Sequence, residues 1–435
     1  MNQIVVFSGE SLNKIYMTDQ KKENSGNIRK TTLSSGLKVV SEKIESVKSV
    51  SVGIWVKTGS RNESNEQAGI THFLEHMLFK GTKKRSAFDV AQSMESVGGY
   101  LNAFTSTEYT CYYARCLDSK LGTAVEVLSD MIKNSQFPVE ELEKEKKVVL
   151  EEMKMYKDSP DDVIFEEFSG QVFKDHPIGR PVIGFEETVK SFNRNDLFDY
   201  IDQRYQPDNL LVAVAGHADH DEVLDLVQDL LNYNQNGNTQ QPVQPLSPYQ
   251  VTSQTVTKPI EQTHMIMGRR ALNYEHPNKY LLLLANTILG GGMSSRLHQN
   301  VREKYGYCYS ISPFNQSYVD TGLFGVYIGT DIEYIDHVRE LINIELLRMK
   351  NERVDEKELS ESKAQLKGKL LLSQENTSNR MTRLAKSEIY FNRFVTLDEL
   401  VENIDAVTSE DLLKFSDEFF DPAQFSETLL IPEPK

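Results

Sequence analysis

Apolar and polar residues alternate in several short stretches of the first half of the chain. The segments at 38–43 and 49–56 follow this two-residue period, which is typical of strands that bury one face. Further strands are expected at 100–105, 109–116 and 210–216. A helical pattern without Gly or Pro covers residues 139–157. The first half therefore predicts a sheet that is backed by helices.

The second half repeats this order of elements. Its strands are expected at 251–257, 263–270, 306–312, 321–330 and 426–431. Its helices are expected at 279–289, 331–351 and 355–389. The repeat predicts an α+β fold of two homologous domains, each a mainly antiparallel sheet backed by helices.

A polar tract at 232–250, rich in Asn, Gln and Pro, separates the two halves and reads as a linker. It divides the chain into a domain at 28–231 and a domain at 251–435. The first 27 residues are polar and contain no apolar core of a signal peptide. We expect this extension, 1–27, to be disordered or a loose arm.

The composition narrows the class of protein. With 39% hydrophobic and 26% charged residues, the chain of 435 residues resembles a globular protein, and no apolar run reaches the ~18 residues of a membrane span. A net charge of −16 argues against nucleic-acid binding, which needs a basic surface. Cys111, Cys116 and Cys308 are too few and too scattered for a disulfide framework. We therefore expect a cytoplasmic protein with reduced cysteines.

Residues 72–76 read HFLEH and carry the most specific chemistry of the chain. On a helix, His72 and His76 lie one turn apart on one face, a spacing that lets two imidazoles reach one metal ion. Glu75 lies on the same side, where it can take a proton from water at that metal. The order H-x-x-E-H is the inverse of the commoner H-E-x-x-H zinc motif.

The helix at 139–157 carries two candidates for a third metal ligand. Glu145 and Glu152 lie on the flank of its apolar face, two turns apart, whereas Glu151 points away and should be solvated. Glu152 is the better ligand candidate, with Glu145 orienting a ligand from behind. Helical geometry leaves an alternative equally open, in which both glutamates pair with Lys146 and Lys147 on a charged helix.

Two segments together, HFLEHMLFKGT at 72–82 and VVLEEM at 148–153, resemble the pitrilysin/insulysin family of zinc metallopeptidases. The likeness is to its short two-domain branch, which includes the mitochondrial processing peptidase and bacterial homologues. In that family a glutamate follows the second His by about 76 residues, which leads here to Glu152. The resemblance implies one zinc ion per chain, held by His72, His76 and Glu152. It also implies Glu75 as the general base and Glu145 as an orienting residue.

The second half lacks these ligands, because its matching helix at 279–289 contains neither His nor Glu. After it come Gly290, Gly291 and Gly292, which resemble the family's glycine-rich loop and are expected to form a flexible turn that touches substrate. Arg302 and Tyr309 have the family spacing of a pair that binds the scissile carbonyl and the substrate backbone. Both side chains donate hydrogen bonds, as a developing oxyanion requires. Without the resemblance they would read as ordinary surface residues.

The segment YLNAFTSTEYT at 100–110 resembles the family's active-site edge strand. An exposed edge binds an extended peptide through main-chain hydrogen bonds, and Asn102, Ala103 and Phe104 are the expected contacts. An ordinary hairpin fits the same residues. His176 lies near a turn and is expected to be structural, not a further ligand.

These features predict a zinc endopeptidase that hydrolyses peptides or unfolded segments. Four-domain relatives close as a clamshell around the peptide, so the resemblance implies a dimer here, most simply a homodimer. A heterodimer with an inactive sister chain also occurs in this branch. The alternative function is a non-catalytic structural or partner subunit, against which Glu75 argues, since a scaffold needs no base beside two histidines. A third possibility is a metal-dependent hydrolase that acts on something other than peptides. The expected peptide-binding edge strand and the Arg/Tyr pair argue against it.

Overall fold

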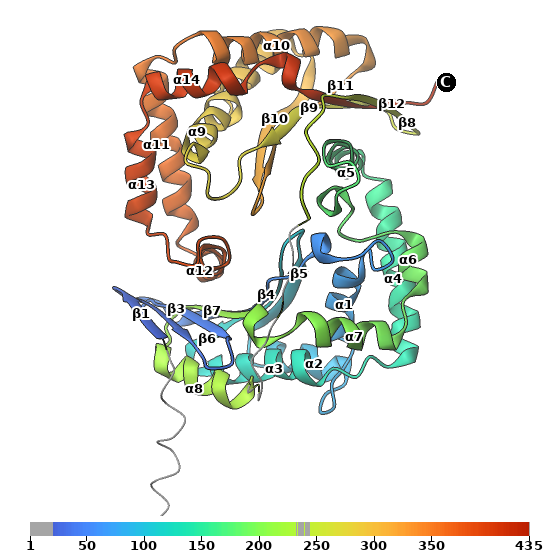
Figure 1. Cartoon of the computed structure of the whole chain (residues 1–435), viewed down its shortest axis with the longest axis vertical. Helices are drawn as coiled ribbons and strands as arrows, with labels where there is room; N and C mark the ends of the chain where they lie inside the picture. Colours follow the sequence, from blue (N-terminus) through green and yellow to red (C-terminus); the bar gives the residue numbers. More distant parts are fainter. Residues whose placement is uncertain (1–20, 232, 234–238, 240–243, 435) are drawn as a thin grey trace, which may run out of the picture.

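The computed structural model describes residues 21–231, 233, 239 and 244–434, with the backbone alone at 21–25. Two mixed sheets, each covered by helices, lie one above the other (Figure 1). Part of the expected linker, at 232, 234–238 and 240–243, lies outside the described residues.

The first sheet has seven strands in the order β1-β2-β3-β7-β4-β6-β5. Its strands are β1 (Lys21–Ser25), β2 (Ile28–Thr32), β3 (Lys38–Lys43), β4 (Ser49–Val56), β5 (Tyr100–Thr105), β6 (Thr110–Leu117) and β7 (Leu210–Gly216). The helices of this half are α1 (Ile70–Leu78), α2 (Ala87–Glu95), α3 (Leu121–Asn134), α4 (Val139–Lys157), α5 (Pro160–Val172), α6 (Glu186–Ser191), α7 (Arg194–Arg204) and α8 (His220–Leu230). Strand β3 pairs with β7 in parallel, and every other neighbouring pair is antiparallel.

The polar N-terminal extension contributes one strand, which corrects the expectation of a loose arm at 1–27. Residues 21–25 form β1 and pair antiparallel with β2 across the two-residue turn Gly26-Asn27, where Gly26 has a φ of 62°. A strand at a sheet edge is held by main-chain hydrogen bonds, so it needs no apolar pattern to reveal it. Residues 1–20 lie outside the described residues.

The second sheet has five strands in the order β10-β11-β9-β12-β8. Its strands are β8 (Ser253–Lys258), β9 (Thr263–Ala271), β10 (Cys308–Ser317), β11 (Gly322–Thr330) and β12 (Ser426–Pro432). The helices are α9 (Lys279–Gly290), α10 (Ile335–Asn351), α11 (Glu356–Ser373), α12 (Thr377–Phe391), α13 (Leu397–Ala406) and α14 (Ser409–Phe419). Strands β8 and β12 pair in parallel and the rest antiparallel, so this sheet repeats the arrangement β3-β7-β4-β6-β5 of the first. The predicted repeat of a mainly antiparallel α+β domain is confirmed.

Two elements of the second half differ from their predicted bounds. The helix expected at 355–389 is two helices, because Asn376 caps α12 by accepting a hydrogen bond from the Ser378 N–H and so starts a new helix. The strand expected at 306–312 extends to Ser317, past Pro313. Proline is tolerated there because β10 is an edge strand, where one side of the backbone has no strand partner.

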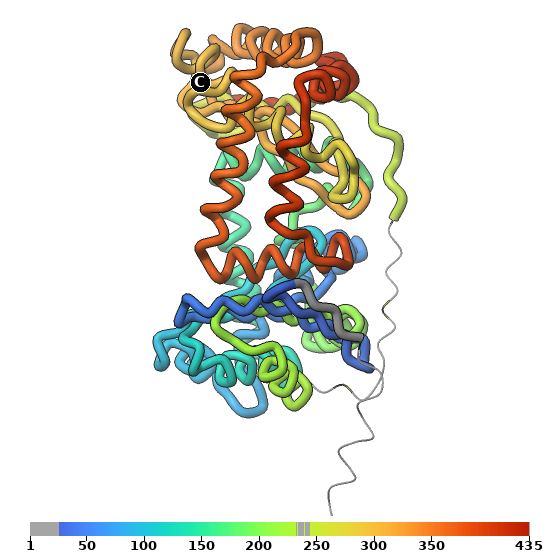
Figure 2. The backbone as a smooth tube through the Cα atoms, turned by 90° about the vertical axis from the view of Figure 1, so that its left-hand side faces the viewer, coloured from blue at the N-terminus to red at the C-terminus, as the bar shows by residue number. Residues whose placement is uncertain are grey.

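Each half contributes one helix that packs on the sheet of the other half. Helix α12 packs across β3, β4 and β7 of the first sheet, and α5 packs on β9 and β12 of the second. Figures 1 and 2 show α12 lying directly on the lower sheet, and Figure 1 shows α5 beneath the upper one. Apolar residues fill both contacts, for example Met381 and Leu384 against Trp55, and Phe168 against Ile266. Burial of these side chains joins the halves into one unit.

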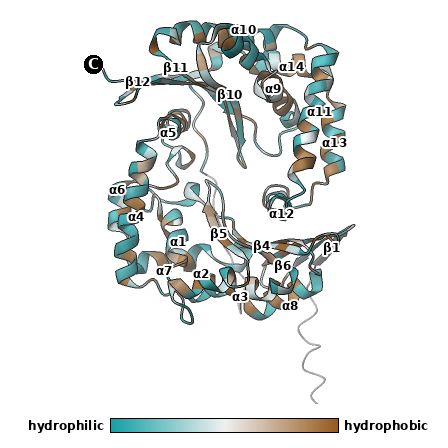
Figure 3. Cartoon of the chain, turned by 180° about the vertical axis from the view of Figure 1, so that it is seen from behind, coloured by the Kyte–Doolittle hydropathy of each residue, from teal (hydrophilic) through white to brown (hydrophobic). Residues whose placement is uncertain are grey.

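Helices α3 and α8 pack on strands of the first sheet and α9 packs on β10 of the second, whereas α4, α11 and α13 contact mainly other helices. Hydrophobic colours follow the strands of the first sheet, whereas α4 at the periphery is largely hydrophilic (Figure 3). Among the described residues, no helix combines the length and apolar character needed to cross a bilayer.

Candidate metal centre

Helix α1 carries the H-x-x-E-H segment, and its apolar residues fix its orientation. Phe73, Leu74 and Met77 are fully buried in the core of the first half. Since these residues occupy the inner face of the helix, His72, Glu75 and His76 lie on its partly exposed face. The helical spacing predicted from the sequence therefore places these three polar side chains on the same side of α1.

The N-terminus of α1 is held by a buried carboxylate. Gly69, the residue before the helix, has a φ of 91° and offers no side chain to cap it. The carboxylate of Glu63 accepts hydrogen bonds from the main-chain N–H groups of Gly69 and Thr71, each at 2.8 Å. Burial raises the pKa of Glu63 to about 7, although both hydrogen bonds oppose that shift. No local sequence pattern indicates this cap, because Glu63 lies six residues before Gly69.

Helix α4 brings two glutamates toward α1. Leu142, Val149 and Met153 are buried beneath it, and Glu145 is buried with them. Glu152 is partly exposed and Glu151 is exposed, as the helical geometry predicts. The alternative, in which Glu145 and Glu152 pair with Lys146 and Lys147, is not seen among the described residues. Lys146 instead contacts Glu143 at 2.8 Å.

The donor atoms of His72, His76 and Glu152 converge. One ligand atom from each lies within 4.8 Å of the other two, so these three residues form a group that could hold a metal ion. Nε2 of His72 lies 3.8 Å from Oε1 of Glu152, and Nε2 of His76 lies 3.6 Å from its Oε2. Ligand atoms at about 2.1 Å from a tetrahedral zinc ion are separated by about 3.4 Å. Two nitrogens and one carboxylate at this spacing fit a zinc ion with an open position.

The two histidines differ in their surroundings, although each has Nε2 near the Glu152 carboxylate. Burial, and then the charge of His76, lower the pKa of His72 to about 3, and its buried Nδ1 has no hydrogen-bond partner among the described residues. Nδ1 of His76 donates to Oε1 of Glu145 at 2.8 Å, which leaves its Nε2 free to bind a metal. Burial by itself would lower the pKa of His76, but the hydrogen bond to Glu145 and the nearby carboxylates raise it.

Glu75 lies beside these ligands in a cavity of about 410 Å³. The cavity is lined by His72 and Glu75 from α1, by Ala103, Phe104 and Thr105 from β5, and by Tyr156, Phe165, Glu166, Arg180, Gln316 and Tyr318. Burial raises the pKa of Glu75, and the Thr105 hydroxyl, which donates to Oε2, opposes this shift. A carboxyl with a raised pKa takes up a proton more readily, as a general base requires. The contact of Thr105 with Glu75 was not predicted, although Thr105 is the last residue of the predicted edge strand.

Strand β5 forms the edge of the first sheet, as predicted. Ala103 and Phe104 line the cavity beside Glu75, whereas Asn102 is exposed and does not line it. The Phe104 ring packs edge-on against Trp55 with 5.6 Å between ring centroids, which anchors the strand. The edge therefore runs into the cavity with its main chain available for pairing.

Arg302 and Tyr309 do not line the cavity of their own chain. Tyr309 lies near the start of β10, whereas Gln316, which lines the cavity, lies near its end. Seven residues of extended strand separate the two positions by about 24 Å. The Arg302 guanidinium lies 5.6 Å from the Tyr309 ring, and Tyr309 is 81% exposed. The pair is adjacent, as its spacing suggests, but it does not line the cavity that holds His72 and Glu75.

The three glycines lie at the end of α9 and in the bends that follow it, and their contact with substrate stays a prediction. Gly290 ends α9, and none of Gly290, Gly291 and Gly292 has a positive φ. A Cβ on Gly290 would lie 1.9 Å from Cδ of Pro313, so close packing against β10 explains this glycine. The Gly291 carbonyl accepts hydrogen bonds from Gln365 and Lys369 of α11. These contacts hold the segment between α9 and α11.

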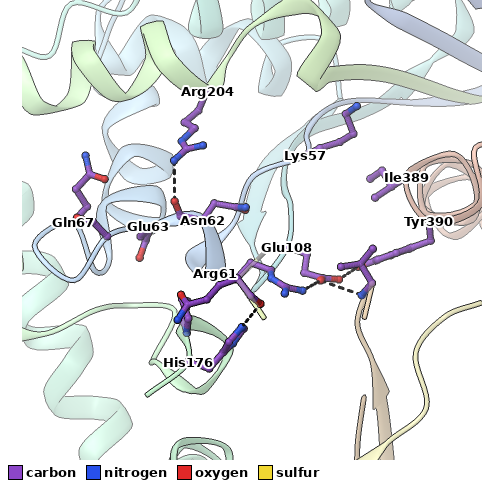
Figure 4. Close-up of a pocket in the computed structure, with 14 residues that line it drawn as sticks. Lys57, Arg61, Asn62, Glu63, Gln67, Glu108, His176, Arg204, Ile389 and Tyr390 are labelled. Atoms are coloured by element: carbon purple, nitrogen blue, oxygen red, sulfur yellow. Dashed lines mark hydrogen bonds and ion pairs between the residues drawn. The ribbon is translucent and has the colours of Figure 1, made fainter. Parts of the chain in front are cut away.

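His176 and the cysteines are packing residues. The ring of His176 accepts from the Ile178 N–H and donates to the Gln244 carbonyl, as expected of a structural histidine. It borders a separate cavity, where Arg61 reaches Glu108 and Tyr390 approaches the same carboxylate from α12 (Figure 4). Cys111, Cys116 and Cys308 are buried and unpaired, in agreement with the sequence-based prediction.

Comparison with known proteins places these features in a family. Residues 38–186 match the model described as Insulinase (Peptidase family M16), and residues 191–366 match the model Peptidase M16 inactive domain. An uncharacterized zinc protease of Bacillus subtilis is 40% identical over 383 residues, which are 88% of this chain and 93% of that protein. One of Streptomyces coelicolor is 38% identical over 397 residues, 89% of this chain and 86% of that protein.

Solved structures share the fold. A protease from Helicobacter pylori superposes with a TM-score of 0.87 at 24% identity, covering 95% of this chain and all of that one. A peptidase M16 inactive domain protein from Pseudomonas fluorescens gives a TM-score of 0.86 at 18% identity, covering 94% of this chain and 98% of that one. Together with the family models and the sequence relatives, these matches show that the chain belongs to peptidase family M16, the insulinase family.

Proposed function

We propose that this protein is a zinc endopeptidase whose metal is held by His72, His76 and Glu152, one ion per chain. The observation that carries this proposal is the convergence of these three donor groups within 4.8 Å, with Glu75 beside them in the same cavity. A zinc ion in this position supplies a Lewis acid and lowers the pKa of bound water.

The chain's own groups account for the proton transfers and for substrate binding. Glu75 accepts a proton from the attacking water and delivers it to the leaving amine. The edge of β5, at Ala103 and Phe104, pairs with an extended peptide and so brings its main chain to Glu75. Recognition through the main chain tolerates many sequences, which suits short peptides and unfolded segments.

Removal of the metal tests this proposal. The purified protein should hydrolyse a quenched fluorescent peptide library, lose that activity with 1,10-phenanthroline, and regain it when zinc is added back. Hydrolysis that survives complete removal of the metal would contradict the proposal. A folded, zinc-loaded protein without activity would favour the alternative of a partner subunit.

We further propose that the active form is a homodimer closed around a chamber. Neither Arg302 nor Tyr309 lines the cavity beside Glu75, and Tyr309 lies about 24 Å along β10 from Gln316, which does line it. In a two-fold dimer, Arg302 and Tyr309 of the partner subunit would supply them. The high exposure of Tyr309, 81%, is compatible with this role.

Mixing of two inactive variants tests the shared site. Glu75→Gln and Tyr309→Phe each remove one component of every site in their own homodimers. In a mixed dimer, one of the two sites has both components intact, so random reassembly should restore about a quarter of the wild-type activity. No recovery in dimers that demonstrably exchange subunits would place Tyr309 outside the site.

A further inference from the structure

A further cavity lies within the second half, and none of the described residues that line it is acidic. It measures about 620 Å³ and is enclosed by α9, α11, α12 and the end of β10. Three basic residues line it, Lys279, Arg383 and Lys386, together with hydroxyl and amide side chains. In a chain with 64 acidic and 48 basic residues, this absence of carboxylates is unusual and indicates an anionic ligand.

Two of the three cations are available to a ligand. Arg383 is engaged, because it donates to Oε1 of Gln374 and to the Val395 carbonyl and lies 3.9 Å from Glu42. Neither Lys279 nor Lys386 forms an ion pair with a carboxylate in the part of the chain that the structure describes. Their ammonium groups therefore have no carboxylate at contact distance, although Glu399 and Glu275 act on Lys279 from farther away.

The two lysines lie beside aromatic rings. Nζ of Lys279 lies 4.3 Å from the Phe391 ring centroid and donates to the Tyr274 carbonyl, and burial lowers its pKa. Nζ of Lys386 lies 5.4 Å from the Tyr109 ring centroid. Tyr274 lines the cavity and stacks on Tyr390 at 3.7 Å. An anion bound here would also meet an apolar surface, which a bare inorganic ion does not use.

The cavity also offers a hydrogen-bond acceptor. Asn315 lines it, and the buried Oδ1 of this residue has no partner among the described residues. Successive residues of a strand face opposite sides, so Asn315 and Ser317 face this cavity while Gln316 lines the one beside Glu75. The end of β10 thus separates the two cavities. A ligand that joins a carboxylate, an N–H donor and an apolar group would satisfy all of these features.

We propose that this cavity binds the carboxylate-terminated end of a peptide. The terminal carboxylate would lie between Lys279 and Lys386, the last peptide N–H would donate to Asn315, and the last side chain would pack on Tyr274 and Phe391. The inference rests on the proposed function for the nature of the ligand, since a peptidase meets such ends in its substrates and forms them as products. It assigns a role to the half of the chain that holds no metal.

Calorimetric titration of the full-length, zinc-loaded Glu75→Gln protein tests the proposal without turnover. The probes are N-acetyl-Ala-Leu-Phe with a free carboxylate and the same peptide as its carboxamide. A hydrogen-bonded charge contributes about 1.5–3 kcal/mol, so the carboxamide should bind at least about tenfold more weakly. Lys279→Met and Lys386→Met, added separately, should weaken binding of the acid by a similar factor. Lys414→Met, an exposed lysine of α14 paired with Glu410, should leave it unchanged.

The outcomes separate this proposal from the previous one. Equal binding of acid and carboxamide, or binding that survives both lysine variants but needs His72, would place the peptide at the metal centre and overturn the inference. Binding of inorganic phosphate as tight as that of the peptide would reduce the site to a simple anion site and also overturn it. Lysine-dependent binding of the acid in a protein whose wild type hydrolyses nothing would support this site while the proposed peptidase function fails.

Discussion

The Nδ1 atom of His76 lies 2.8 Å from Oε1 of Glu145, which is buried two turns before Glu152 on α4. Lys80 contacts the other carboxylate oxygen at 2.6 Å. Burial alone would raise the pKa of Glu145, but His76 and Lys80 hold it below its ordinary range. The carboxylate therefore stays ionised and fixes the imidazole with Nε2 toward Glu152.

Replacement of this carboxylate should weaken metal binding. We expect Glu145→Gln to lower zinc affinity by about 10–100-fold, because the His76 ring loses its charged partner. Competition with a chromophoric chelator measures the affinity directly. Glu151→Gln, on the exposed face of the same helix, is the matched control and should bind zinc like the wild type. Equal affinities in all three proteins would show that Glu145 does not orient the ligand.

Glu63 should make stability depend on pH in an unusual direction. Its carboxyl has a pKa near 7 in the folded protein and 4.5 when unfolded, so the folded state binds more protons between these values. The contribution of Glu63 to stability is therefore full below about pH 4.5 and declines as the pH rises to about 7, by roughly 3 kcal/mol.

Comparison with Glu63→Gln isolates this effect, because both proteins share every other titrating group. The Tm of the metal-free wild type should fall relative to that of Glu63→Gln between pH 5 and pH 7.5, as scanning calorimetry can measure. Glu66→Gln, in the same loop but exposed, should follow the wild type. A difference that stays constant over this interval would mean that Glu63 is ionised throughout.

Arg61 should be essential to the contact between the halves. Its guanidinium contacts Glu108 of the first half and forms two hydrogen bonds, at 3.1 and 2.9 Å, with Asp320 of the second. Arg61→Met would leave the buried carboxylate of Glu108 without its positively charged partner, a loss that costs about 3–5 kcal/mol. A large fall in Tm is expected, whereas Arg115→Met, an exposed residue of β6, should have little effect. Similar Tm values for the two variants would show that water replaces the pair.

Gly290 should tolerate no side chain. The Cβ of Gly290→Ala would overlap Pro313, whose ring cannot move away without shifting β10. Gly368→Ala, inside α11 with open space around it, should instead be neutral or stabilise the protein by up to about 1 kcal/mol. Thermal unfolding of the two variants compares them. A Gly290→Ala protein as stable as the wild type would show that close packing on Pro313 does not explain this glycine.

The sequence predicts those parts of the structure that depend on local periodicity. The helical positions of His72, Glu75 and His76, and the contrast between Glu151 and Glu152, follow from residues on one turn or one helix. The repeat of strand order follows from two-residue alternation. The break at 374–376 was missed because both sides of it favour helix, and only the cap at Asn376 ends the run.

Other features depend on contacts between distant segments and could not be read from one sequence. The exchange of α5 and α12 between sheets joins residues that are far apart in the sequence, such as Phe168 and Ile266 or Trp55 and Met381. The packing of Gly290 on Pro313 and the cap of α1 by Glu63 are of the same kind. The separation of Arg302 and Tyr309 from the histidines of their own chain emerged only from the length of β10.

The most direct test of the account is hydrolysis of a quenched fluorescent peptide library by the wild type and by Glu75→Gln, with zinc measured in both. The account predicts that the wild type cleaves peptides and that the variant loses this activity, while each protein retains one zinc ion per chain. Comparable cleavage by a zinc-loaded Glu75→Gln protein would contradict the role of Glu75 as base, and a folded wild type that binds no zinc would contradict the metal centre itself.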